Sequence, residues 1–199
     1  MMVLSVGFYE VVAKRRSVRK FRIEPVPEEA LNRVLEAGRL APSAGNTQPW
    51  HFIVITDASV KVKIANVCTE FSRKAWANFS PETAGYLAAR GGSWDKSGMA
   101  KVPVLIAVCF RVPQGIREEL ALGSAWATIE NMLLAATAEG LGSCIYTFYG
   151  LEEENRTKEI LGVPENYRIA AIIQLGYSAA EPQKPSRKEL KEIVSYQHF

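Results

Sequence analysis

The stretch that decides the fold is Pro103-Val104-Leu105-Ile106-Ala107-Val108-Cys109-Phe110. After the proline, every side chain is apolar, at odd and even positions alike. A strand with one face in water alternates between apolar and polar residues, so this run is typical of a strand buried on both faces. The run therefore predicts the central strand of a sheet.

Further elements are predicted on both sides of this strand along the chain. Apolar runs predict strands over 51–56, 143–147 and 168–176. Helical spacing or an amphipathic pattern predicts helices over 27–41 and 59–79, an Ala-rich interior predicts one over 117–139, and glycine and proline stop signals close one over 151–161. The stretch at about 80–101 contains four glycines and is interpreted as a lid or insertion. The Pro- and Lys-rich chain from about 178 to 199 is interpreted as an extended arm, and the whole of 1–199 as a single domain.

Composition excludes several classes of function. With 48% hydrophobic and 23% charged residues, the chain of 199 residues is typical of a globular domain, and its net charge of +3 does not favour nucleic acid as a partner. The longest apolar run, 102–110, is too short to cross a bilayer, so we expect no membrane partner and a cytoplasmic location. Two histidines cannot build a histidine-based metal site, and three well-separated cysteines are expected to be buried, reduced thiols.

A dense basic run near the start of the chain, Arg15-Arg16-Ser17-Val18-Arg19-Lys20, carries four cations and one hydroxyl. Such a cluster repels itself unless an anion lies against it. On a helix, Arg15 and Arg19 share a face one turn apart, with Ser17 near its edge. Guanidinium forks and a hydroxyl are the donors that a phosphate monoester needs. The alternative, from this run alone, is a solvated basic helix end.

No fingerprint of a self-sufficient enzyme accompanies the basic run. The sequence contains no G-x-G-x-x-G, Walker loop, H-E-x-x-H or G-x-S-x-G motif. We therefore expect a bound cofactor to supply the chemistry, while the protein supplies position and electric field.

Further motifs follow the basic run in a fixed order. They are Pro42-Ser43-Ala44-Gly45-Asn46-Thr47-Gln48-Pro49-Trp50, Gly140-Leu141-Gly142, Leu161-Gly162-Val163-Pro164-Glu165, Ile172-Ile173-Gln174-Leu175-Gly176-Tyr177 and Lys184-Pro185-Ser186-Arg187. With this order and spacing, the chain resembles the nitroreductase family of FMN-dependent oxidoreductases over most of its length, except from about residue 67 to 101. The resemblance implies an α+β, nitroreductase-like fold with a mixed, mostly antiparallel central sheet flanked by helices. It also implies a homodimer with swapped C-terminal arms and FMN sites at the subunit interface.

The resemblance assigns cofactor-binding residues in three parts of the chain. Phosphate ligands are Arg15, Arg16, Ser17 and Arg187, and Arg19 reaches the pyrimidine edge of the flavin. The residues contributed to the flavin of the opposite subunit are Pro42, Ser43, Ala44 and Asn46. The loop under the flavin, where a backbone N–H meets N5, is Ile145, Tyr146, Thr147 and Phe148. Family members often have glycine in this loop, so Thr147 and Phe148 are expected to narrow the substrate face.

The implied reaction passes a hydride from NAD(P)H through flavin N5 to a small organic acceptor such as a nitroaromatic, a quinone or an enone. The reactive centre is the flavin itself, so no side chain is assigned as catalytic and no metal is expected. One alternative is a reductive dehalogenase acting on a halotyrosine, because the predicted lid resembles the lid of those family members. The lid residues are Glu82, Tyr86, Trp94 and Lys96. A second alternative is a non-catalytic flavin-binding or sensor module.

Overall fold

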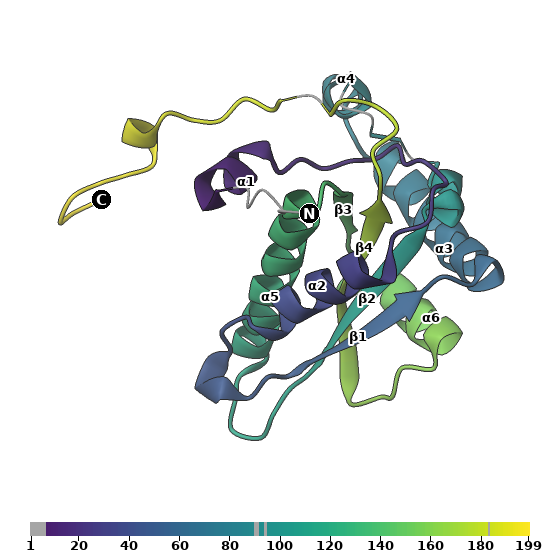
Figure 1. Ribbon diagram of the computed structural model, residues 1–199, viewed down its shortest axis with the longest axis horizontal. Helices are drawn as coiled ribbons and strands as arrows, with labels where there is room; N and C mark the ends of the chain where they lie inside the picture. Colours follow the sequence, from purple (N-terminus) through teal and green to yellow (C-terminus); the bar gives the residue numbers. More distant parts are fainter. Residues whose placement is uncertain (1–6, 90–91, 94, 183) are drawn as a thin grey trace.

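A computed structural model of the protein describes residues 7–89, 92–93, 95–182 and 184–199. Within these residues, four antiparallel strands form a sheet in the order β1-β2-β4-β3 (Figure 1). The strands are β1 (Trp50–Ile55), β2 (Val104–Arg111), β3 (Gly142–Tyr146) and β4 (Tyr167–Gly176). The predicted α+β fold is confirmed, and the bounds of each predicted strand lie within one residue of those observed.

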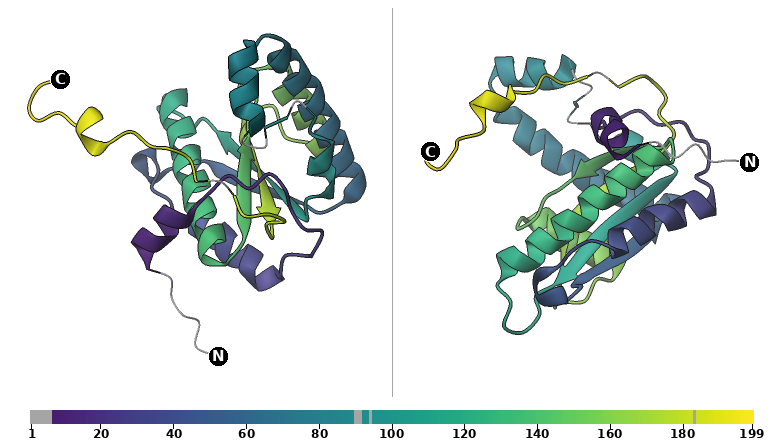
Figure 2. Two further views of the ribbon diagram at one scale, coloured as in Figure 1. Left: turned by 90° about the horizontal axis from the view of Figure 1, so that it is seen from above. Right: turned by 60° about the vertical axis from the view of Figure 1, so that its left-hand side comes forward.

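Two pairs of helices cover the two faces of the sheet (Figure 2). Helices α2 (Glu28–Arg39) and α5 (Glu118–Ala138) pack on one face, and α3 (Ala58–Ala77) and α6 (Glu152–Leu161) pack on the other. All four helices were predicted, with bounds that agree within two residues.

Strand β2 lies inside the sheet and supplies side chains to both hydrophobic cores, as its uninterrupted apolar run predicts. Val104, Ile106, Val108 and Phe110 pack with α2 and α5, whereas Leu105, Ala107 and Cys109 pack with α3. The alternation of strand side chains between faces explains this division.

The basic run is extended, and the expectation that it is helical is wrong. Helix α1 (Phe8–Lys14) ends just before it. Ser17 then forms a parallel bridge with Ser143 of β3, and the backbone N–H of Val18 donates to the Ser143 carbonyl at 2.9 Å. This pairing buries Val18, which is 5% exposed, and avoids stacking like charges as a helix would. This isolated bridge is parallel, whereas the strand pairs within the four-stranded sheet are all antiparallel.

The segment interpreted as a lid contains two unpredicted elements, the α-helix α4 (Pro81–Ala89) and the short 3-10 helix η2 (Ser97–Lys101). The hydroxyl of Ser80 accepts a hydrogen bond from the Thr83 N–H at 3.2 Å. A serine cap followed by proline at the first helical position is the start signal that could have revealed α4. No side chain of α4 is buried.

After pairing with Phe21 and Lys20 through Ser178 and Ala179, the C-terminal arm extends away from the body of the molecule (Figures 1 and 2). In its described part, the regular elements are a bridge at Ser178 and the single turn η3 (Leu190–Glu192). Apolar side chains of this arm are exposed, among them Leu190 at 73% and Tyr196 at 83%. None of the helices in the described ranges is both long and apolar enough to cross a membrane.

Candidate cofactor site

The basic run is held between the edge strand β3 and the start of the C-terminal arm. On the β3 side, Val18 packs so closely on Gly142 that a Cβ atom there would lie 2.6 Å from Val18 Cγ2. On the arm side, the backbone N–H of Ala179 donates to the Lys20 carbonyl at 2.9 Å. Glycine at 142 is therefore required for this close approach, which fixes the position of the run.

A cavity of about 600 Å³ lies between the basic run, helix α4 and the arm. This is the size of a typical small-molecule site. The charged residues of its wall are six cations and one carboxylate: Arg15, Arg16, Arg19, Lys20, Lys184, Arg187 and Glu181. Ser17 lines the same wall, so the fold brings together all the phosphate ligands that the resemblance assigns.

The positive charge of this cavity is only partly compensated by the protein. Arg15 Nε lies 3.3 Å from Glu130 Oε1 of α5. Arg16 donates to backbone carbonyls, and Arg187 donates to the Ser186 carbonyl at 3.2 Å. In the part of the chain that the structure describes, Arg16, Lys184 and Arg187 form no ion pair. Guanidinium groups beside a hydroxyl, with excess positive charge, suit a phosphate monoester.

The predicted lid residues do not gather at one place. Tyr86 of α4 lines the cavity, whereas Glu82 of the same helix does not. The Lys96 ammonium lies 5.7 Å from the centre of the Tyr146 ring, outside the cavity wall. Burial lowers the pKa of Lys96, and the nearby positive charge of Arg19 acts in the same direction. Trp94 lies outside the described residues.

The segment assigned to the flavin face comprises the end of β3 and the two residues after it, and none of its four residues lines the cavity. Its aromatic side chains pack toward α3. The Tyr146 hydroxyl lies 2.6 Å from Ser72 Oγ and donates to the Cys68 carbonyl at 2.8 Å, while Phe148 is 3% exposed in the core beside α3. The expectation that Phe148 narrows the substrate face is therefore wrong, because burial of its ring is more favourable. Ile145 is partly buried against the opposite core, and Thr147 is exposed.

The segment Pro42–Asn46 lies away from the cavity within one chain. The backbone N–H of Ala44 donates to Ser124 Oγ near the start of α5, at 3.1 Å, and none of these residues lines the cavity. Asn46 has a positive φ of 53°, which an asparagine tolerates. Ser43 Oγ accepts from the backbone N–H of Gln48 at 3.0 Å, so the segment is a tightly folded surface feature.

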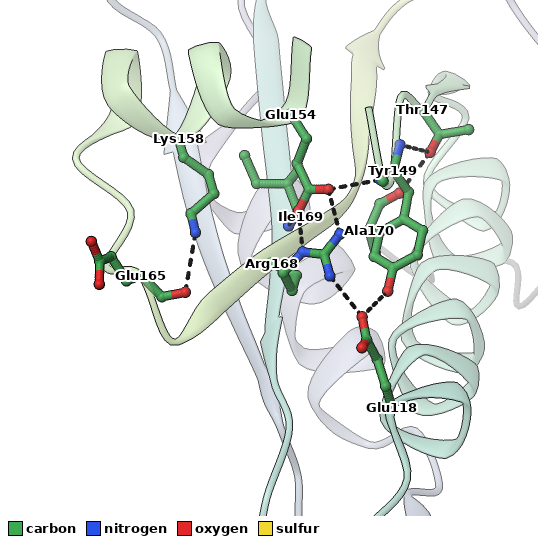
Figure 3. Close-up of polar contacts among 10 residues, drawn as sticks. Glu118, Thr147, Tyr149, Glu154, Lys158, Glu165, Arg168, Ile169 and Ala170 are labelled. Atoms are coloured by element: carbon green, nitrogen blue, oxygen red, sulfur yellow. Dashed lines mark hydrogen bonds and ion pairs between the residues drawn. The ribbon is translucent and has the colours of Figure 1, made fainter. Parts of the chain in front are cut away.

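Sequence reasoning missed a buried ion pair behind the flavin-face loop (Figure 3). Glu154 of α6 is 1% exposed and binds Arg168 of β4 through both carboxylate oxygens at 2.8 Å. Burial alone raises the pKa of Glu154, but hydrogen bonds from Arg168 and two backbone N–H groups hold the pKa below its ordinary value. In sequence, Glu152-Glu153-Glu154 is an ordinary acidic first helical turn, so no local signal marks Glu154.

Comparison with known proteins leads to the same family that the sequence motifs resemble. The model of the nitroreductase family matches residues 12–177. The chain belongs to the nitroreductase family. It is 29% identical over 191 residues to the iodotyrosine deiodinase of Thermotoga neapolitana, covering 96% of this chain and 98% of that protein. It is 30% identical over 193 residues to the NADH dehydrogenase of Thermus thermophilus, covering 91% of each.

A solved structure shares most of the chain's architecture. It is a crystal structure of oxidized iodotyrosine deiodinase bound to FMN and 3-iodo-L-tyrosine. The TM-score is 0.85 at 28% sequence identity, over 97% of this chain and 100% of that one. Membership of the family is therefore supported by sequence and by fold together.

Proposed function

We propose that this nitroreductase-family chain binds FMN in the basic cavity and is an oxidoreductase that transfers a hydride from NADH or NADPH to a small organic acceptor. The observation that carries the proposal is the cavity wall. It holds six cations, contributed by the two segments that resemble those carrying the family's phosphate ligands, and one carboxylate, that of Glu181.

The residues of the cavity wall fit FMN, and different residues are proposed to bind its phosphate and its flavin ring. Arg15, Arg16, Ser17 and Arg187 supply charged forks and a hydroxyl to the phosphate. Arg19 supplies a fixed positive charge further along the run, where it stabilises negative charge on the flavin's pyrimidine edge. When bound, FMN supplies two-electron hydride chemistry at its N5 atom.

A second copy of the chain completes the site in this proposal. The segment Pro42–Asn46 does not reach the cavity of its own chain. The arm carries exposed apolar residues that a partner would cover, such as Leu190, Ile193 and Tyr196. Covering them contributes roughly 25 cal/mol per Å² of apolar surface removed from water. We therefore propose a homodimer with the arms exchanged.

A second candidate function is reductive dehalogenation of a halotyrosine. It is favoured by the likeness to iodotyrosine deiodinase in both sequence and structure, with a TM-score of 0.85. It is also favoured by Tyr86, which lines the cavity from a helix without buried side chains. In this proposal α4 closes over the substrate, and Glu82 and Lys96 hold the charged amino and carboxylate groups.

Anaerobic reduction separates these candidates. The FMN-loaded protein is mixed with NADH or NADPH, and loss of the oxidised flavin absorption is followed in time. Menadione or 3-iodotyrosine is then added, and reoxidation is measured. We expect rapid reduction by a nicotinamide and rapid reoxidation by the quinone.

Other outcomes have distinct meanings. Reoxidation by 3-iodotyrosine with release of iodide, after reduction by dithionite and not by nicotinamide, favours the dehalogenase. Bound FMN that neither nicotinamide nor acceptor affects indicates a non-catalytic flavin module. A chain that takes up no FMN contradicts the proposal.

A further inference from the structure

Glu154 is the centre of a polar network behind the flavin-face loop (Figure 3). Its carboxylate accepts four hydrogen bonds: two from Arg168 at 2.8 Å each, one from the Gly150 N–H at 2.8 Å and one from the Ile169 N–H at 3.0 Å. A carboxylate that is 1% exposed is costly to bury, and these bonds offset that cost. The carboxylate therefore joins α6, β4 and the loop after β3 at one point.

The same network continues to the first turn of α5. Arg168 Nη1 donates to Glu118 Oε1 at 2.7 Å, and the Tyr149 hydroxyl forms a hydrogen bond with the same oxygen. The Arg168 guanidinium lies over the Tyr149 ring, 4.6 Å from its centre. Such stacking adds a cation–π contribution to the ion pairs. Arg168 thus contacts three elements of the fold through one planar group.

Every residue of the segment 147–150, here called the anchored loop, is fixed by a different contact. The Thr147 hydroxyl donates to the Ala170 carbonyl at 2.9 Å, and Phe148 is buried in the core. Tyr149 is held by Arg168 and Glu118, as described above. Gly150 has a φ of 78°, and its N–H is held by Glu154. A surface loop does not need this many anchors unless its backbone position matters.

Two backbone donors of the anchored loop, the N–H groups of Thr147 and Phe148, have no protein partner among the described residues. Phe148 as a whole is 3% exposed, because its ring lies in the core beside α3. Backbone donors of buried residues are nearly always paired. Both donors lie in the segment that the resemblance places at the flavin.

We propose that Glu154, acting through Arg168 and Gly150, is a positioning residue that fixes the anchored loop so that its backbone N–H meets the reactive edge of the flavin. This inference rests on the proposed FMN-dependent function. A buried ion pair is weak evidence for stability as such, whereas a small displacement of a group at a reacting centre is costly. Glu154 therefore matters for the properties of the bound flavin as well as for folding.

The test compares two buried glutamates that are neighbours in α6. Glu154→Gln removes the charge at the anchored loop. Glu153→Gln is the matched control, because Glu153 is 5% exposed and pairs with Lys74 of α3 at 3.4 Å. Within the described ranges, its carboxylate forms no hydrogen bond or ion pair with the anchored loop. Both variants should melt at lower temperature. The decisive readout is the midpoint potential of the bound flavin.

We expect the potential to rise in Glu154→Gln alone. The flavin N5 accepts a hydrogen bond when oxidised and carries a hydrogen when reduced, so a well-placed N–H stabilises the oxidised form. Loosening that donor should shift the reduced-to-oxidised ratio about tenfold, which is about 30 mV for a two-electron couple. The FMN dissociation constant should change less than threefold, since the phosphate ligands are untouched.

A third variant keeps the test decisive if Glu154→Gln does not fold. Tyr149→Phe removes only the hydroxyl contact with Glu118 and should raise the potential by a smaller amount. Equal potentials in the wild type, Tyr149→Phe and every glutamate variant that folds would show that the network is merely structural. A wild-type chain that binds no FMN contradicts the proposed function itself, a result distinct from bound FMN with unchanged potentials.

Discussion

Replacing Gly142 with alanine should weaken FMN binding although residue 142 does not line the cavity. A Cβ atom at this position would lie 2.6 Å from Cγ2, 2.8 Å from Cβ and 2.9 Å from Cγ1 of Val18. Carbon atoms in contact prefer about 3.5–4.0 Å, so Val18 must retreat by roughly 1 Å. Its β-branched side chain has little rotamer freedom to avoid the clash. The backbone of the basic run must therefore move with it.

Gly142→Ala should lower both the folding stability and the affinity for FMN, and the size of each loss can be worked out separately. Overpacking of this kind costs about 1–3 kcal/mol of folding stability. Movement of Ser17, the proposed phosphate ligand next to Val18, should break at least one hydrogen bond to the phosphate. A hydrogen bond to a charged group contributes about 1.5–3 kcal/mol. We therefore expect FMN to bind Gly142→Ala about 10- to 100-fold more weakly.

Calorimetric titration with FMN and a thermal melt measure the two effects separately. Gly123→Ala in α5 is the matched control, since an added Cβ there meets nothing within 4 Å. It should bind FMN normally and be equally stable or more stable by up to about 1 kcal/mol. Adding Val18→Gly to Gly142→Ala removes all three clashing atoms of residue 18 and should restore binding in part. Unchanged FMN affinity in Gly142→Ala, or no recovery in the double variant, would refute the argument that this glycine positions the run.

Three further predictions concern the phosphate site, acid stability and the lid. Arg187→Ala should weaken FMN binding about tenfold or more, given about 1.5–3 kcal/mol for a hydrogen bond to a charged group; an unchanged calorimetric affinity would mean that the arm does not contact the phosphate. The pKa of Glu154 is lowered in the fold, so its contribution to stability is present above the unfolded value of about 4.3 and is lost as the pH falls through the folded value. When urea unfolding is measured from neutral to acidic pH, the free energy of unfolding should accordingly fall more steeply for the wild type than for Glu154→Gln. An equal fall for both would contradict the stabilising role of the ionised carboxylate. Changing Glu82, Tyr86 and Lys96 together to Ala should leave FMN bound and menadione reduced while altering the ranking of larger acceptors, and an identical acceptor profile would show that these side chains are only surface.

The parts of the fold that were predicted correctly depend on local pattern. The uninterrupted apolar run of β2 is informative because both faces of a central strand are buried, and no distant contact is needed to recognise it. Helix α5 was likewise found from local sequence, namely its Ala-rich interior of small residues and the glycine after it.

The parts that were missed depend on contacts across the chain. The basic run is extended because Val18 pairs with Ser143 and packs on Gly142, about 125 residues later in sequence. Phe148 turns into the core because α3 leaves a place for its ring. Glu154 is buried because Arg168 meets it from the adjacent strand. Each of these features depends on a contact with a residue distant in the sequence, and local propensity carries no information about such contacts.

The most direct test of the central claim is a titration of the purified chain with FMN and, separately, with riboflavin, which lacks the phosphate. If the basic cavity holds the phosphate with at least two charged hydrogen bonds, each contributing about 1.5–3 kcal/mol, FMN should bind at least about 100-fold more tightly than riboflavin. The difference should shrink in Arg16→Ala and Arg187→Ala. Equal affinity for FMN and riboflavin, or binding of neither, would contradict the assignment of this cavity as the phosphate site.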